Sequence, residues 1–427
     1  MQNNVLEYLE KTVQRVPDKV AFANDKYEID FQTVYNNARA IGSFLYNEGY
    51  YKQPIVVFME KHPKAIVSFF GALYGGGYYV PLDEEMPKHR IELIFESLKP
   101  QIVICDEKTR EQLDDFSYEG VACLYDDIIN TKQDETALGY VREHHIDTDP
   151  MYIVFTSGST GVPKGVVACH RSVIDYVEQL SETLQFDENT VFGNQSPLYF
   201  DACLKEIYPT IKFGATTYLI PKNLFMFPIK LVEFLNEKSI NTICWVVSAL
   251  TMISGFGVFE KVIPDKLTNI AFGSEVFPIK QFKLWRQALP NARFTNLYGP
   301  TECTGMSCYY KDEEIYSDKV VLAVGRKGAS WLSDICAKHK IETKLGSVDI
   351  GIRYELPDKV MEKINEYMYE GKFIGRPFPY GDKVRTFCQN PSGFVSAEVY
   401  DNGLTLVNWR LCATDFISSW TSACAEN

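Results

Sequence analysis

Short apolar runs alternate with helix-like segments along the first 300 residues of the chain. Candidate strands are rich in β-branched and aromatic residues, and they lie at 55–58, 102–104, 152–155, 217–220, 243–247 and 270–272. Apolar residues recur at helical spacing over 4–14, 31–46, 62–74, 170–183, 229–238 and 279–288. Strands that alternate with helices in this way predict βα units. We therefore expect an α/β fold with mainly parallel sheets flanked by helices.

The pattern changes near residue 311. A charged run, Lys311-Asp312-Glu313-Glu314, precedes a new strand, glycine turn and helix start over 320–332. We place a domain boundary after residue 311 and expect a short α+β segment over 312–408. Residues 409–427 show no clear periodicity, so we expect a poorly packed tail there.

One stretch without charged residues has to be weighed as a membrane span. It runs from Thr242 to Phe259 and has eighteen residues, which is long enough for a short transmembrane helix. Polar residues and glycines interrupt it, so we expect a buried strand, a turn and a short helix instead. The N-terminus alternates apolar and charged residues and lacks the apolar region of a signal peptide.

Composition narrows the class of protein. The 427 residues are 46% hydrophobic and 23% charged, which is typical of a folded globular chain. The formal net charge of −13 argues against nucleic acid or an anionic membrane as a partner. The eleven cysteines form no C-x-x-C pair and no metal-type spacing. We therefore expect reduced thiols and a cytoplasmic protein.

The strongest chemical signal follows a predicted buried strand. Residues 156–165 read Thr-Ser-Gly-Ser-Thr-Gly-Val-Pro-Lys-Gly and come directly after the apolar run 152–155. Glycines and small hydroxyl residues let backbone N–H groups and hydroxyls approach a polyphosphate closely, and Lys164 adds positive charge. The spacing is not that of the P-loop of kinases and GTPases, because Pro163 stands where that motif continues toward its lysine. The loop predicts a phosphate site of a different fold.

Segment 152–167 resembles the signature loop of the adenylate-forming superfamily, which includes nonribosomal peptide synthetase adenylation domains, D-alanyl carrier-protein ligases and acyl-CoA synthetases. Segments 73–83, 194–201 and 296–302 resemble further motifs of that family, in the same order along the chain. The resemblance covers residues 1–311. It implies an AMP-binding domain that uses ATP and Mg²⁺ to join a carboxylic acid to AMP, with release of pyrophosphate.

The resemblance also implies roles for individual residues around the nucleotide. The phosphates would lie against Thr156, Ser157, Gly158, Ser159, Thr160, Gly161 and Lys164. Tyr298 would stack on the adenine, and the ring would be surrounded by Gly273, Ser274, Glu275, Asn296 and Gly299. Thr301 would contact the α-phosphate and Glu302 would hold Mg²⁺. Lys164, Thr301 and Glu302 are therefore the predicted catalytic residues.

Asp201 indicates that the acid is an amino acid. A carboxylate in a half-buried pocket is costly unless a cation pairs with it, and the substrate ammonium would be that cation. Asp201 could also be the N-cap of a helix over 202–208. By the same resemblance the pocket would include Ala202, Cys244, Ile270, Phe272, Leu297 and Met306, together with Gly305 and with Lys205 either in the pocket or in solvent. The expected acceptor is an acyl or peptidyl carrier protein.

The resemblance ends after the adenine motif. The family carries a Tyr/Arg-Thr-Gly-Asp segment for the ribose and a C-terminal lysine for the reacting carboxylate, and neither is found over 312–427, where Gly381-Asp382 lacks the threonine. Segments 320–332, 348–353 and 382–391 instead resemble part of a flavin-dependent dehydrogenase without its dinucleotide loop. We therefore expect a hybrid that binds ATP weakly and adenylates slowly or not at all. A non-catalytic remnant and an acyl-CoA-type ligase are the alternatives.

Overall fold

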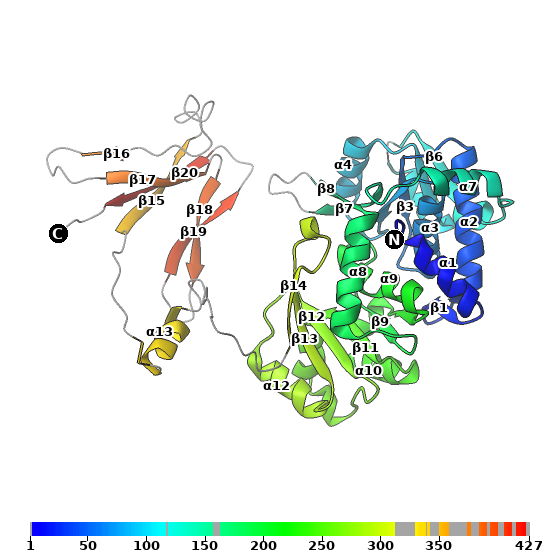
Figure 1. Ribbon diagram of the computed structural model, residues 1–427. Helices are drawn as coiled ribbons and strands as arrows, with labels where there is room; N and C mark the ends of the chain where they lie inside the picture. Colours follow the sequence, from blue (N-terminus) through cyan, green and yellow to red (C-terminus); the bar gives the residue numbers. More distant parts are fainter. Residues whose placement is uncertain are drawn as a thin grey trace. The chain divides into compact units, whose positions relative to one another are not determined.

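The computed structural model describes residues 2–116, 118–156, 163–311, 329–338, 340–341, 350–357, 374–376, 384–390, 393–399, 405–411 and 416–423. The chain divides into two compact units (Figure 1). The first consists of Met1–Gly158 and Val162–Glu314, and the second includes Ile315–Asn427. A domain boundary after residue 311 stays a prediction.

A six-stranded sheet forms one half of the first unit. Its strands are β3 (Pro54–Phe58), β4 (Tyr78–Leu82), β5 (Ile102–Cys105), β6 (Val121–Leu124), β7 (Pro150–Thr156) and β8 (Lys164–Cys169), in the order β6-β5-β3-β4-β7-β8. All neighbours are parallel except β7 and β8. Helices α3 (Pro63–Tyr74), α4 (Lys88–Leu98), α5 (Glu107–Leu113), α6 (Tyr125–Ile128) and α7 (Glu135–His144) belong to this half. The β7–β8 hairpin was not predicted, because the sequence pattern indicated only its first strand.

An eight-stranded sheet forms the other half. Its strands are β1 (Val20–Ala23), β2 (Glu28–Asp30), β9 (Val191–Asn194), β10 (Thr216–Leu219), β11 (Thr242–Val246), β12 (Asn269–Gly273), β13 (Arg293–Tyr298) and β14 (Cys308–Lys311). The order is β14-β13-β12-β11-β9-β10-β1-β2. The six central strands are parallel, and β14 and β2 add an antiparallel strand at each edge. The predicted α/β fold with mainly parallel sheets is confirmed.

The remaining helices of the first unit are α1 (Leu6–Arg15), α2 (Phe31–Asn47), α8 (His170–Leu184), α9 (Leu204–Phe213), α10 (Pro228–Glu237), α11 (Val247–Gly255) and α12 (Ile279–Ala288), with short 3₁₀ turns η1 (Asp201–Cys203), η2 (Lys222–Met226), η3 (Val258–Glu260) and η4 (Thr301–Cys303). Each predicted helix is confirmed to within two residues at either end. Local chemistry sets some of these limits. The Asp30 carboxylate accepts the backbone N–H of Thr33 at the start of α2 (2.6 Å), and Pro63 occupies the first turn of α3.

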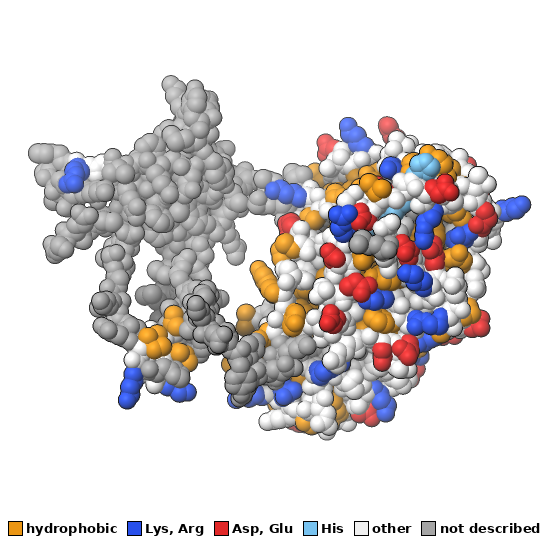
Figure 2. All heavy atoms as spheres, in the orientation of Figure 1, with side chains coloured by type: hydrophobic (Ala, Val, Ile, Leu, Met, Phe, Trp, Pro, Cys, Tyr) orange, Lys and Arg blue, Asp and Glu red, His pale blue; other side chains and the backbone are white. Residues whose placement is uncertain are grey.

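The uncharged stretch 242–259 forms β11, α11 and η3, so the predicted buried strand and short helix are confirmed. Within the described ranges, no helix has the length and apolar character needed to cross a membrane. On the face of the first unit drawn in Figure 2, acidic and basic side chains are interspersed rather than gathered by sign.

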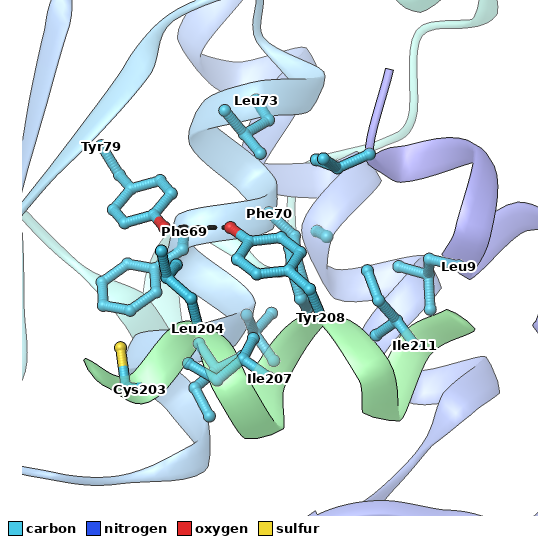
Figure 3. Close-up of a cluster of buried hydrophobic side chains, with 14 of the residues drawn as sticks. Leu9, Phe69, Phe70, Leu73, Tyr79, Cys203, Leu204, Ile207, Tyr208 and Ile211 are labelled. Atoms are coloured by element: carbon cyan, nitrogen blue, oxygen red, sulfur yellow. Dashed lines mark hydrogen bonds between the residues drawn. The ribbon is translucent and has the colours of Figure 1, made fainter. Parts of the chain in front are cut away.

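An apolar cluster joins the two halves of the first unit (Figure 3). Phe69 of α3 stacks on Tyr79 of β4 with ring centroids 4.3 Å apart. Phe70 of α3 meets the ring of Tyr208 of α9 edge-on. The phenol oxygens of Tyr79 and Tyr208 lie 2.9 Å apart, so each buried hydroxyl has a hydrogen-bond partner. Because α9 lies in the half that contains the eight-stranded sheet, this contact fixes the two sheets against each other.

The second unit contains α13 (Ala329–Lys338), β15 (Ile350–Pro357), β16 (Ile374–Gly375), β17 (Val384–Asn390), β18 (Gly393–Val399), β19 (Thr405–Leu411) and β20 (Phe416–Ala423). One sheet has the order β15-β20-β17-β16, and β18 and β19 form a hairpin; all these pairs are antiparallel. Strand β20 and the end of β19 fall within 409–427, so the tail expected there is partly strand. The pattern gave no sign of it, because serines and threonines interrupt the apolar residues of β20.

Candidate functional site

Strands β7 and β8 flank the predicted phosphate loop in sequence and pair with each other. Thr156 and Lys164 face each other across the hairpin, and the Thr156 hydroxyl donates to the Lys164 carbonyl oxygen (3.4 Å). Lys164 is exposed, so its ammonium group is open to an anion. Five further predicted residues, Ser157, Gly158, Ser159, Thr160 and Gly161, lie outside the described residues.

Thr301 and Glu302 lie in the loop between β13 and β14. The backbone N–H of Ser307 donates to the carbonyl of Tyr298 (2.9 Å), which closes the loop. A Cβ added to Gly299 would collide with the carbonyl oxygen of Gly305. Only glycine therefore allows the two sides of the loop to approach this closely. The position of Gly299 in the predicted adenine motif thus has a steric cause.

Glu302 is exposed at the tip of this loop. No group of three or more histidine, cysteine or acidic side chains that could hold a metal ion occurs among the residues described. Magnesium does not require such a group, because it commonly takes one or two carboxylates together with substrate phosphates and water. A single exposed carboxylate beside a phosphate loop fits that mode of binding.

Asp201 lies next to Thr301. It opens η1 and is half-buried, and its carboxylate has a polar contact with the Thr301 side chain. Burial raises the pKa of Asp201, while Thr301 and the nearby Lys205 act in the opposite direction. Helix α9 starts at Leu204 without a side-chain cap, so the alternative role of Asp201 as its N-cap is wrong.

Three motifs that are distant in sequence therefore meet in one place. Strand β8, which begins with Lys164, packs beside η4, which contains Thr301 and Glu302. Thr301 in turn reaches Asp201. The arrangement places a phosphate-type loop, an exposed carboxylate and a half-buried carboxylate around one region of the first unit.

A cavity of about 500 Å³ lies at the ends of strands β12 and β13. The predicted adenine residues Ser274, Glu275, Asn296 and Tyr298 line it, together with Phe272, Val276 and Tyr310. Tyr298 is 67% exposed and presents its ring to this space. A Cβ on Gly273 would collide with the carbonyl oxygen of Leu297, so β12 and β13 approach closely here. A flat apolar ligand with hydrogen-bonding edges suits this lining.

Two details of this cavity were not predicted. The Glu275 carboxylate accepts the backbone N–H of Ser248 at the start of α11 (2.6 Å), so it also stabilises that helix end. Tyr310 faces Asn296 across the β13–β14 pair, and Val276 is 89% exposed at the rim. An exposed valine beside an exposed tyrosine is a signal for a ligand surface, but only the fold brings the two together.

The predicted amino acid pocket is divided between two faces of the eight-stranded sheet. Cys244 and Leu297 are buried on the face that also holds Tyr176, and Met306 packs against this cluster. Ala202 is half-buried in η1 beside Asp201. These residues therefore lie on the side of the sheet that Asp201 occupies.

Ile270 and Phe272 lie on the opposite face. Both belong to the cluster around Trp245 and Trp285, whereas Ala271 between them belongs to the Cys244 side. Successive strand residues point to opposite faces of a sheet, so the placement of Ile270 in the amino acid pocket is wrong. Phe272 reaches the cavity lined by Tyr298 instead.

Buried charges lie beneath the Asp201 loop. Lys205 is only 5% exposed, so the alternative in which it points to solvent is wrong. Glu206 is fully buried, accepts a hydrogen bond from the Asn194 amide (3.2 Å), and has its pKa raised to about 7 by burial. Lys61, whose pKa burial lowers to about 7, donates to the carbonyls of Asn194 (2.8 Å), Gln195 (3.0 Å) and Ile220 (3.4 Å).

Comparison with known proteins gives a family and a set of relatives. The AMP-binding enzyme family model matches residues 9–330. The chain is 29% identical over 325 residues to an L-proline--[L-prolyl-carrier protein] ligase of Pseudomonas fluorescens, covering 72% of this chain and 64% of the relative. It is 28% identical over 385 residues to a D-alanine--D-alanyl carrier protein ligase of Staphylococcus aureus, covering 90% of this chain and 74% of the relative. The chain thus spans about two thirds of the first of these relatives.

Solved structures share the fold of the first unit. The nonribosomal peptide synthetase FmoA3 in its alpha-methyl-L-serine-AMP bound form superposes with a TM-score of 0.66 at 22% identity, over 73% of this chain and 35% of that chain. VinN superposes with a TM-score of 0.62 at 20% identity, over 72% of this chain and 78% of that chain.

The expected flavoprotein-like fragment is not borne out. The family match extends to residue 330, past the predicted boundary, and the alignment with the Staphylococcus ligase covers 90% of the chain. The misleading turn, Gly325-Arg-Lys-Gly328, lies outside the described residues, and a Gly-x-x-Gly turn between a strand and a helix occurs in many unrelated folds.

Proposed function

Because this chain belongs to the AMP-binding enzyme family, we propose that it joins an amino acid to AMP from ATP, with release of pyrophosphate, and passes the aminoacyl group to a carrier protein. The carrier-protein ligases that it matches support the amino acid and the carrier as substrates. Eight described cysteines are free thiols, which supports a reducing compartment such as the cytoplasm.

The polar contact between the Asp201 carboxylate and the Thr301 side chain carries the proposal. It joins a carboxylate that can hold a substrate ammonium to the loop that can hold the α-phosphate. An amino acid bound by Asp201 would therefore have its own carboxylate close to the reacting phosphorus. A fatty acid has no ammonium group that could pair with a half-buried aspartate, so a pocket for fatty acids gives no reason for Asp201.

The reaction forms a bond between a carboxylate oxygen and the α-phosphorus, while the bond to pyrophosphate breaks. No protein nucleophile is needed, so the chain acts by positioning and by balancing charge. Lys164 and Thr156 would bind the phosphates, Thr301 would contact the α-phosphate, and Tyr298 and Asn296 would hold the adenine. Glu302 would hold Mg²⁺, which when bound neutralises phosphate charge.

Pyrophosphate exchange with a panel of D- and L-amino acids tests the function. We expect exchange that depends on an amino acid. Asp201→Ala should abolish the amino acid dependence and weaken ATP binding at most slightly, because Asp201 would hold the ammonium group and meets the nucleotide site only through Thr301. Asp175→Ala, which removes an exposed carboxylate from α8, is the matched control.

Two results would contradict the proposal. Exchange driven by carboxylic acids that lack an amino group would indicate an acyl-CoA-type ligase. An unchanged melting temperature with and without Mg-ATP, together with no exchange, would indicate a non-catalytic remnant.

A further inference from the structure

A second cavity, of about 800 Å³, lies between helix α8 and the β13–β14 end of the eight-stranded sheet. Tyr176, Gln179 and Leu180 of α8 line one wall, and Leu297, Thr304 and Met306 line the other. None of the nucleotide roles uses this space. Leu297 and Met306 are also residues of the predicted amino acid pocket, so the cavity begins where that pocket is expected to end.

Tyr176 lines this cavity and also interacts electrostatically with Asp201. Its side chain is 8% exposed, and its phenol interacts electrostatically with the Cys244 thiol and with the carboxyl groups of Glu206 and Asp201. Burial raises the pKa of the phenol well above its ordinary value, so the ring is neutral. The tyrosine thus faces the amino acid side with its hydroxyl and lines the cavity with the rest of its surface.

The ring is held against the loop between β13 and β14. Gly305 has φ +84°, and a Cβ placed on it would lie 3.1 Å from the Tyr176 Cζ atom. The absence of a side chain at Gly305 therefore leaves room for the ring. A buried aromatic ring packed in this way loses little further entropy when a ligand contacts it, so it is suited to act as a fixed wall.

We propose that Tyr176 is a specificity-determining residue, whose ring closes the amino acid pocket toward the α8 cavity and limits the substrate to amino acids with short side chains. The inference rests on the proposed function. The proposed selection is steric, because a single aromatic ring separates the amino acid pocket from the open cavity behind it. Removal of the ring should join the two spaces and admit a longer apolar side chain.

Binding of unreactive aminoacyl-AMP analogues tests this on the full chain without requiring catalysis. The probes are aminoacyl sulfamoyl adenosines that carry an alanyl, a norleucyl or a 2-aminooctanoyl group. Wild-type protein should bind the alanyl analogue and discriminate against the longer ones. In Tyr176→Ala, the affinity for the longer analogues relative to the alanyl analogue should rise by about tenfold or more, since one methylene in an apolar pocket already changes binding by about that factor.

Three controls separate the ring from other causes. Tyr176→Phe keeps the ring and should keep the wild-type preference. Leu180→Ala enlarges the cavity away from the ring and should also keep it. Should Tyr176→Ala fail to fold, as shown by circular dichroism, Tyr176→Leu removes the ring with a smaller loss of packing and should show the same shift.

The outcomes are distinguishable. Wild-type protein that binds none of the three analogues would contradict the proposed function itself. Wild-type binding of the alanyl analogue with an unchanged length preference in folded Tyr176→Ala or Tyr176→Leu would overturn the inference and leave the proposed function intact. A shift in Tyr176→Phe or Leu180→Ala equal to that in Tyr176→Ala would also overturn it, because the ring would then not be the wall.

Discussion

Beneath the loop that carries Asp201, Glu206 is fully buried and Lys61 is half-buried, and burial shifts the pKa of both groups. Asn194 joins them, because its amide donates to the Glu206 carboxylate and its carbonyl accepts from Lys61. Burying charge is costly even when partners are present. The pKa of Glu206 is therefore raised from 4.5 to about 7, which makes the stability of the fold depend on pH near neutrality.

The sign of that dependence leads to a prediction for Glu206→Gln. Between pH 4.5 and pH 7 the unfolded chain has an ionised Glu206 while the folded chain retains the proton, so the free energy of unfolding of the wild type falls as pH rises through this window. Glutamine does not titrate. The stability of Glu206→Gln relative to wild type should therefore rise between pH 5 and pH 8 by about 2–3 kcal/mol, measured by urea unfolding.

Glu178→Gln is the control for this experiment. Hydrogen bonds from Lys212 and Tyr8 lower the pKa of Glu178 despite its partial burial, so it stays ionised across the same range. The stability difference between this variant and wild type should not change from pH 5 to pH 8. A difference for Glu206→Gln that is equally constant would show that Glu206 is ionised throughout in the folded protein.

At the scale of single residues, the sequence predicted the candidate site residues that stand in a recognisable local motif. Asp201, Thr301 and Tyr298 stand in short segments with distinctive composition, and each lies where a ligand could reach it. The burial of Lys205 and Glu206 could not be predicted, because charged residues on a helix are ordinarily solvated. Ile270 was misplaced because the face to which a strand residue points depends on pairing with strands far away in sequence.

At the scale of elements, the β13–β14 loop depends on the contact between Gly299 and Gly305. In Gly299→Ala the new methyl group would meet the Gly305 carbonyl, which cannot move without opening the loop. We expect a loss of about 2–3 kcal/mol in the free energy of unfolding and weaker ATP binding, because Tyr298 and Thr301 would be displaced. Chemical denaturation and calorimetric titration with Mg-ATP measure the two effects.

Gly139→Ala is the matched control for Gly299→Ala, because an added methyl group has room at position 139. Gly139 lies within α7, and a Cβ there would meet nothing within 4 Å. Alanine in a helix interior should stabilise the protein by about 0.5–1 kcal/mol and leave ATP binding unchanged. If both variants behaved alike, the close approach of Gly299 to Gly305 would not be important for the loop.

Helices and strands differed in how well the pattern of residues predicted them. Helices such as α2 and α8 have a long apolar stripe, and their ends could be placed to within two residues. Strands such as β8 and β14 could not, because edge strands in hairpins are short and lie partly exposed. These same hairpins carry the phosphate loop and the Thr301 loop, so the least predictable strands position the candidate site.

At the scale of the whole molecule, the three apolar clusters of the described residues lie entirely before residue 307. We therefore expect a chain of residues 1–314 to fold alone. It should unfold cooperatively, with a melting temperature within a few degrees of the full chain and an ATP affinity within about twofold, since each domain has its own core. Differential scanning calorimetry and titration with Mg-ATP on both chains check this.

A broad transition or aggregation of the 1–314 chain would contradict the predicted boundary after residue 311 and would show that later residues complete the core.

The sequence alone predicted the α/β class but not the two sheets or their strand orders. Those depend on pairings such as β1 with β10, which are separated by nearly two hundred residues and have no local signature.

Lys61 follows β3 in the six-stranded sheet, yet its ammonium group holds carbonyls at the ends of β9 and β10 in the eight-stranded sheet. The residues it anchors open the loop that leads to Asp201. The loop that is proposed to recognise the substrate is thus anchored to both sheets. Substitution of a single side chain such as Tyr176 leaves these contacts of Lys61 in place, so under the proposal the choice of amino acid can change without loosening the junction between the two sheets.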